Sequence, residues 1–167
     1  MIDPEPLLDR LQAAEARLAA HADAQRPGLT HADARTGERW EAGQVWAHLA
    51  EFPAYWVGQL HALQAAHAAG VPQPIPFGRT RADPSRGAAI EARRREDSVA
   101  LLGDVRSGIA AARVLSDSLT ASEWALVGLH PTLGEMPVPG IVERFLVGHL
   151  EEHATQLDEL AAHPEEA

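Results

Sequence analysis

The chain has 167 residues, of which 46% are hydrophobic and 23% charged, and 24 acidic against 14 basic residues give a formal net charge of −10. This balance is typical of a globular protein that can bury a core, and the negative charge argues against nucleic acid and membrane surfaces as partners. All basic residues are arginines and cysteine is absent, which excludes a lysine Schiff base, a cysteine nucleophile, thiolate metal ligands and disulfides.

The N-terminal part of the sequence favours a helix and shows no targeting signal. The residues around Pro4 are acidic and lack the basic and apolar regions of a secretory signal, and no apolar run approaches the length of a membrane span. We therefore expect a cytoplasmic protein with a single domain over residues 1–167. Leucines recur at helical spacing from Leu7 to Leu18, so a first helix is predicted from about Pro4 to before Pro27.

A second helix is predicted from about Trp40 to Ala69, because apolar residues at helical spacing form one of its faces. Pro53 lies inside this helix, where it predicts a kink rather than a break. The segment that follows, residues 71–78, has proline at every second position from Pro72. This pattern predicts an extended crossover.

Two further long helices are expected in the second half of the chain. One covers residues 83–118, and the other covers about residues 139–161. A capping box predicts a short helical turn over residues 120–124, and a loop is expected over residues 128–139. No segment alternates as a strand does, so the predicted fold class is all-α, with four long helices packed as a bundle.

Three histidines interrupt the apolar faces of these helices. His149 and His153 are four residues apart, which places both rings on one helix face within reach of a shared ion. His48 has a similar position in the second helix, and a bundle can bring it opposite the pair. Three neutral imidazoles and water make a catalytic type of metal site. The alternative is that each is a core histidine bonded to ordinary neighbours.

Two residues near this group are candidates for catalysis. Glu51 lies three residues after His48, so it can accept a hydrogen bond from a ligand or act as a general base. A glutamate that faces solvent explains it equally well. His130 is expected in the loop before the last helix, where it can cover the metal or orient a substrate, or simply lie at the surface.

Further residues are candidates for substrate binding: Trp56, Tyr55, Gln156 and Arg79. The aromatic residues are equally explained as core, and Gln156 as a structural hydrogen-bond partner. Arg79, together with Arg81 and Arg86, flanks the crossover and can receive the carboxylates of an anionic cosubstrate. The other histidines are expected at the surface: His21, His31, His61, His67 and His163.

Three segments together resemble the DinB/YfiT-like superfamily in order and spacing over almost the whole chain. They are residues 40–51, residues 130–136 and residues 145–157, the last of which contains the pattern HxxxHxxQL. The resemblance implies an up-down-down-up four-helix bundle and a metal ion bound by the three histidines. Isomerase-like members of the superfamily have a carboxylate at the position of His149, so the subgroup with three histidines fits this chain better.

The resemblance also suggests a function, because the superfamily contains thiol-dependent S-transferases and the mycothiol-dependent maleylpyruvate isomerase. We expect a divalent-metal-binding S-transferase that uses a small-molecule thiol, mycothiol or bacillithiol, on an unknown electrophile. Zinc is the favoured ion, with nickel and iron as alternatives. A homodimer is also expected. The alternatives are a hydrolase that uses metal-bound hydroxide, and a non-catalytic bundle that binds a ligand or acts in a stress response.

Overall fold

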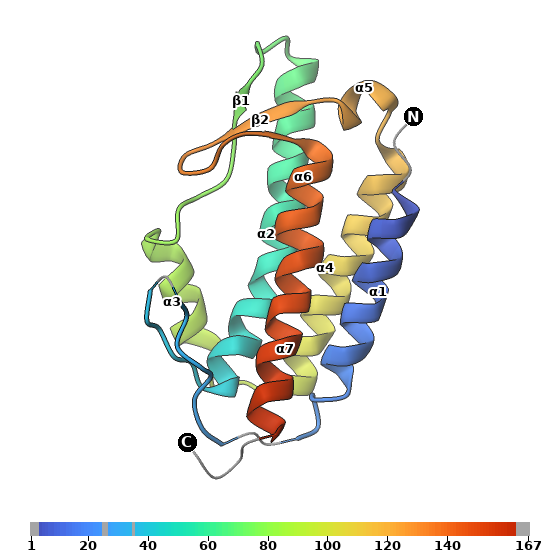
Figure 1. Ribbon diagram of the computed structural model, residues 1–167. Helices are drawn as coiled ribbons and strands as arrows, with labels where there is room; N and C mark the ends of the chain where they lie inside the picture. The colour runs from blue at the N-terminus through green and yellow to red at the C-terminus, as the bar shows by residue number, and fades with distance from the viewer. Residues whose placement is uncertain (1–3, 25–26, 35, 163–167) are drawn as a thin grey trace.

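The computed structural model describes residues 4–24, 27–34 and 36–162, and four long helical segments dominate this part of the chain (Figure 1). The fourth segment is built from three consecutive helices that share one axis. The bounds of the bundle helices are α1, Glu5–Ala19; α2, Ala42–Ala68; α4, Ser98–Ser118; and, for the fourth segment, α6, Val138–Val142, η1, Glu143–Val147, and α7, Gly148–Ala162.

The helices run in the predicted up-down-down-up order (Figure 1). Helices α1 and α7 point one way, while α2 and α4 point the other way. Helix α2 packs against both α4 and α7, and α1 packs against α4 and α7 on the opposite side. The all-α bundle that the sequence predicts is therefore confirmed, and α2 and α7, which carry the three histidines, are neighbours.

Helix α2 continues through Pro53, as expected. Its N-terminus is closed by a capping box between Glu41 and Gln44, which satisfies backbone N–H groups that the first turn leaves unpaired. The face toward the bundle is apolar, with residues such as Leu49 and Leu63 almost fully buried. None of the helices in the described part of the chain has the length and apolar character that a bilayer crossing requires.

The prediction of a single helix over residues 83–118 is wrong, because the chain forms two helices there. Helix α3, Pro84–Arg93, ends before a short turn, and α4 begins at Ser98. The Asp97 side chain accepts hydrogen bonds from the N–H groups of Val99 and Ala100. This N-cap starts a new helix in place of a continuous one.

The prediction of a loop over residues 128–139 is wrong in part. The prediction that the chain has no strand is also wrong. Strands β2, Val127–His130, and β3, Gly134–Pro137, form an antiparallel hairpin, and β1, Ile75–Pro76, pairs with β2 in parallel. Figure 1 shows this small sheet across one end of the bundle. Through the pairing of β1 with β2, this sheet connects the crossover to the segment that leads into the last helix.

Candidate metal centre

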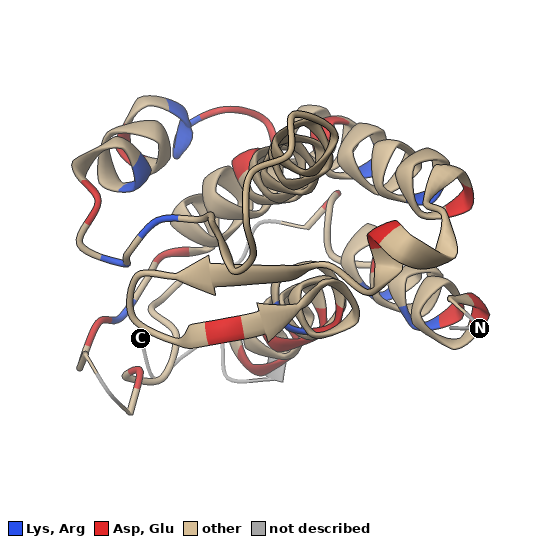
Figure 2. Ribbon diagram, turned by 90° about the horizontal axis from the view of Figure 1, so that it is seen from above, with Lys and Arg blue, Asp and Glu red and all other residues tan. Residues whose placement is uncertain are grey.

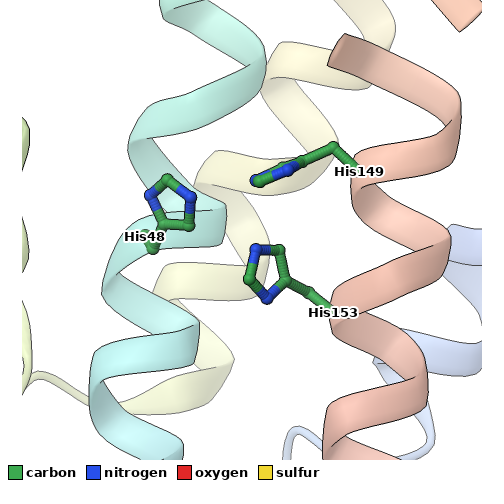
Figure 3. A group of neighbouring side chains, drawn as sticks. All are labelled: His48, His149 and His153. Atoms are coloured by element: carbon green, nitrogen blue, oxygen red, sulfur yellow. The ribbon is translucent and has the colours of Figure 1, made fainter. Parts of the chain in front are cut away.

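The three histidines predicted as ligands converge between α2 and α7 (Figure 3). Their ligand atoms all lie within 4.8 Å of one another. The ring centroid of His149 lies 4.8 Å from that of His48 and 4.3 Å from that of His153. A tetrahedral zinc ion holds its nitrogen ligands roughly 3.3 Å apart, so these nitrogens would have to move closer together to share one ion.

The surroundings of the rings fit a metal ion. His48 is 1% exposed and His153 is 5% exposed. His149 is partly accessible from a cavity, but its Nε2 atom is buried and has no hydrogen-bond partner among the described residues. A buried polar atom without a partner costs free energy. A divalent ion would accept this lone pair, so the donor set fits the ion that the sequence predicts.

All three rings are neutral near neutral pH. Burial is the main cause that lowers the pKa of His48 and of His149 well below the ordinary histidine value. Burial also lowers the pKa of His153 to about 4. Imidazole binds metal ions only in its neutral form, so the site keeps its ligands in the form that coordination requires.

Gln156 fixes the orientation of the His153 ring. The Nδ1 atom of His153 lies 2.7 Å from Oε1 of Gln156. Because an amide oxygen only accepts, Nδ1 carries the proton and Nε2 keeps its free lone pair for an ion. Gln156 also lines the cavity, and its role in substrate binding stays a prediction.

We expect the substitution Gln156→Leu to weaken metal binding by about 10- to 100-fold, the usual cost of losing a partner that orients a ligand. Gln156→Glu is the matched control, since a carboxylate keeps the acceptor and should retain the affinity. Competition with a chromophoric chelator measures both. Equal affinities for Gln156→Leu and the unaltered protein would show that this hydrogen bond does not orient the ligand.

Glu51 lies near His48 and is paired with Arg79. An Oε1 atom of Glu51 is 3.8 Å from Nδ1 of His48, and the same carboxylate forms an ion pair with Arg79. Burial raises the pKa of Glu51 above its ordinary value, while the Arg79 charge opposes the shift. The Arg79 guanidinium also lies 4.0 Å from the centroid of the Tyr55 ring. The distance between Glu51 and His48 is too long for a hydrogen bond, and Nδ1 of His48 has no hydrogen-bond partner among the described residues. The roles of Glu51 as an acceptor for a ligand and as a general base stay predictions.

Aromatic rings support the imidazoles, and the sequence alone did not assign two of them to the site. The Phe52 ring is stacked on His149 with 3.4 Å between centroids. Trp40 is stacked on His153 at 5.9 Å and meets the edge of His48 at 5.2 Å. The signal for Phe52 was its spacing of four residues from His48, which puts both on one helix face.

His130 was expected in a loop, but it is the last residue of strand β2 and is 5% exposed. Its Nε2 lies 3.1 Å from the carbonyl oxygen of Arg79, and its Nδ1 accepts N–H hydrogen bonds from Thr132 and Leu133. Both ring nitrogens are thereby occupied within the sheet region. A catalytic role for His130 stays a prediction.

The three histidines line a cavity of about 520 Å³. Trp56 stacks on Phe145 in its wall, with 3.7 Å between the ring centroids. Phe145 belongs to η1, a π-helical turn that the sequence did not predict. Of the predicted substrate-binding residues, Trp56, Arg79 and Gln156 line the cavity. Tyr55 is not among the lining residues, and its role stays a prediction.

No protein family recognised from sequence matches the chain, and no curated protein matches it. Solved structures match it in fold. YfiT from Bacillus subtilis, a probable metal-dependent hydrolase with an unusual four-helix bundle topology, matches with a TM-score of 0.68 and 17% identity, over 97% of this chain and 89% of that chain. The mycothiol-dependent maleylpyruvate isomerase matches with a TM-score of 0.70 and 12% identity, over 93% of this chain and 61% of that chain. The chain has the DinB/YfiT-like fold.

The chain also matches an uncharacterised protein from Clostridium difficile 630 in fold, with a TM-score of 0.63 and 11% identity, over 97% of both chains. This chain spans only 61% of the length of the isomerase, whereas it covers most of YfiT. The superfamily resemblance seen in the sequence is thereby confirmed at the level of the fold.

Proposed function

We propose that the chain is an enzyme that binds one divalent metal ion through His48, His149 and His153 and uses it to activate a small-molecule thiol. The observation that carries the proposal is the convergence of three neutral imidazoles within 4.8 Å at the wall of a 520 Å³ cavity. Zinc is the favoured ion, and nickel and iron remain alternatives because the same donors suit them.

A divalent ion with three neutral ligands would act as a Lewis acid, lowering the pKa of a thiol or water that occupies its remaining position. The protein orients one of the three rings, that of His153, through its hydrogen bond with Gln156. The aromatic side chains of Phe52, Trp56 and Phe145 line the cavity and limit water around the reacting groups. Because the chain has no cysteine, the thiol must come from a cosubstrate, for which we propose mycothiol or bacillithiol.

Thiol transfer is tested with metal-loaded, untagged protein, mycothiol or bacillithiol, and a chromogenic electrophile such as chlorodinitrobenzene. We expect turnover that requires both the metal and the thiol and that His149→Ala removes. His67→Ala is the matched control, since His67 lies exposed on the same helix as His48. Rates equal to those of the His149→Ala protein with every thiol would contradict the transferase proposal.

A second candidate is a metal-dependent hydrolase, favoured by the match to YfiT over most of both chains. The same site would then activate water. Turnover of ester or amide substrates by the metal-loaded protein without any thiol would support the hydrolase and argue against the transferase. A homodimer stays a prediction, for which sedimentation velocity is the measurement.

A further inference from the structure

The cavity beside the three histidines is lined by arginines as well as by acidic residues. Of the 14 arginines in a chain with a net charge of −10, four line this cavity: Arg79, Arg81, Arg86 and Arg144. Figure 2 shows arginine positions on α3 and on the segment that leads into it, alongside the bundle. Acidic residues also line the cavity, so the state of each arginine decides what it offers to a ligand.

Two of the four arginines are neutralised by carboxylates. Arg79 forms an ion pair with Glu51, and Arg81 lies 3.3 Å from a carboxylate oxygen of Asp33. Arg144 is exposed to solvent, where water satisfies its charge. These three arginines therefore need no ligand.

Arg86 differs from the others, because it is half-buried and its guanidinium has neither a hydrogen bond nor an ion pair with any residue that the structure describes, its one hydrogen bond being from the backbone N–H to the carbonyl oxygen of Asp83. Its guanidinium lies over the Trp40 ring, 5.1 Å from the ring centroid. Burial lowers the pKa of Arg86, while the charge of the exposed Glu38 opposes this effect. A cation–π contact offsets only part of the lost hydration of a guanidinium.

Arg86 is also close to the three histidines. The Trp40 ring that it covers is the one stacked on His153 and in edge contact with His48. Burial is the main cause that lowers the pKa of the three histidines, neighbouring histidines come next for His48 and His149, and among the arginines Arg86 has the largest lowering effect on all three. An ion in the histidine group would place two more positive charges near Arg86, and an anionic ligand would reduce the repulsion between them.

We propose that Arg86 binds a carboxylate of the ligand that occupies the cavity, so that a small anionic molecule spans from Arg86 across Trp40 to the three-histidine group. This inference rests on the proposed metal site and adds the chemical class of the ligand. A guanidinium donates two parallel N–H hydrogen bonds to the two oxygens of a carboxylate, which makes it selective for planar anions. The carboxylate belongs either to the thiol or to the electrophile.

The first experiment uses untagged protein loaded with cobalt(II), in which a bound thiolate gives a charge-transfer band. Mercaptoacetate, mercaptopropionate and mercaptohexanoate are each titrated against the corresponding neutral amide. For at least one chain length, we expect the acid to bind about tenfold more tightly, as one charge-assisted hydrogen-bonded pair supplies. Arg86→Gln should remove this preference, whereas Arg95→Gln, which removes an exposed charge outside the cavity, should keep it.

A second arm identifies the source of the carboxylate. Cobalt protein saturated with neutral mercaptoethanol is titrated with acetate and with succinate. Binding that Arg86→Gln abolishes would place the carboxylate on the electrophile, and a preference seen only in the first arm would place it on the thiol. Equal affinities of acids and amides together with no Arg86-dependent binding of free carboxylates would overturn the inference alone. Failure of cobalt to bind would overturn the metal site and the inference with it.

Discussion

Replacement of His149 by alanine is expected to lower the affinity for zinc by more than about 100-fold, beyond the usual cost of losing a residue that only orients a ligand. The reason is that His149 supplies a buried Nε2 with no hydrogen-bond partner among the described residues. The variant also loses the ring that stacks on Phe52. Chelator competition measures the affinity, and circular dichroism checks that the variant remains folded.

His67→Ala provides the control for this experiment, because His67 is an exposed histidine at the end of α2. It should bind zinc as the unaltered protein does. An affinity that falls equally in both variants would point to unspecific binding by surface histidines. An affinity that His149→Ala leaves unchanged would remove His149 from the ligand set.

The metal-free protein is expected to lose stability steeply as the pH falls below about 6.5, the pKa of histidine in an unfolded chain. The pKa of His153 is about 4 in the folded state, and those of His48 and His149 are also well below the ordinary value. Between these limits the unfolded chain takes up protons that the folded protein does not. For each pH unit by which the pH falls within this range, each histidine therefore lowers the free energy of unfolding by up to about 1.4 kcal/mol.

Three such histidines together lower the free energy of unfolding by up to about 4 kcal/mol per pH unit, which is large beside the 5–15 kcal/mol that is typical of a domain. Urea titrations at several pH values in the presence of EDTA measure the effect. In His149→Gln the pH dependence should be shallower by about 1.4 kcal/mol per pH unit. Parallel curves for the two proteins would show that His149 is protonated in the folded state.

The bundle could be predicted from the sequence because its helices carry strong apolar faces. Where the prediction failed, the deciding interaction was local. Residues 83–118 have helical periodicity throughout, but the Asp97 cap divides them into two helices. Strands β2 and β3 have four residues each, too few for a pattern of alternation. The π-helical turn η1 is set by its backbone hydrogen bonds, for which the sequence gives no signal.

The convergence of the three histidines could also be predicted, since histidines in apolar helix faces need buried partners. The state of the surrounding residues could not, because it depends on contacts between distant segments. Arg79, Arg81 and Arg86 have the same chemistry in sequence, yet the structure leaves only Arg86 of the three without an ion pair among the described residues. His21, expected at the surface, is buried with its Nε2 2.6 Å from Asp158. His163 lies outside the described residues.

An anomalous difference map from crystals of the zinc-loaded protein, recorded at the zinc absorption edge, tests the metal site most directly. We expect one peak between α2 and α7, about 2.0–2.1 Å from one nitrogen of each of His48, His149 and His153. A map with no peak among these rings, or with zinc only at exposed histidines, would contradict the proposed metal site.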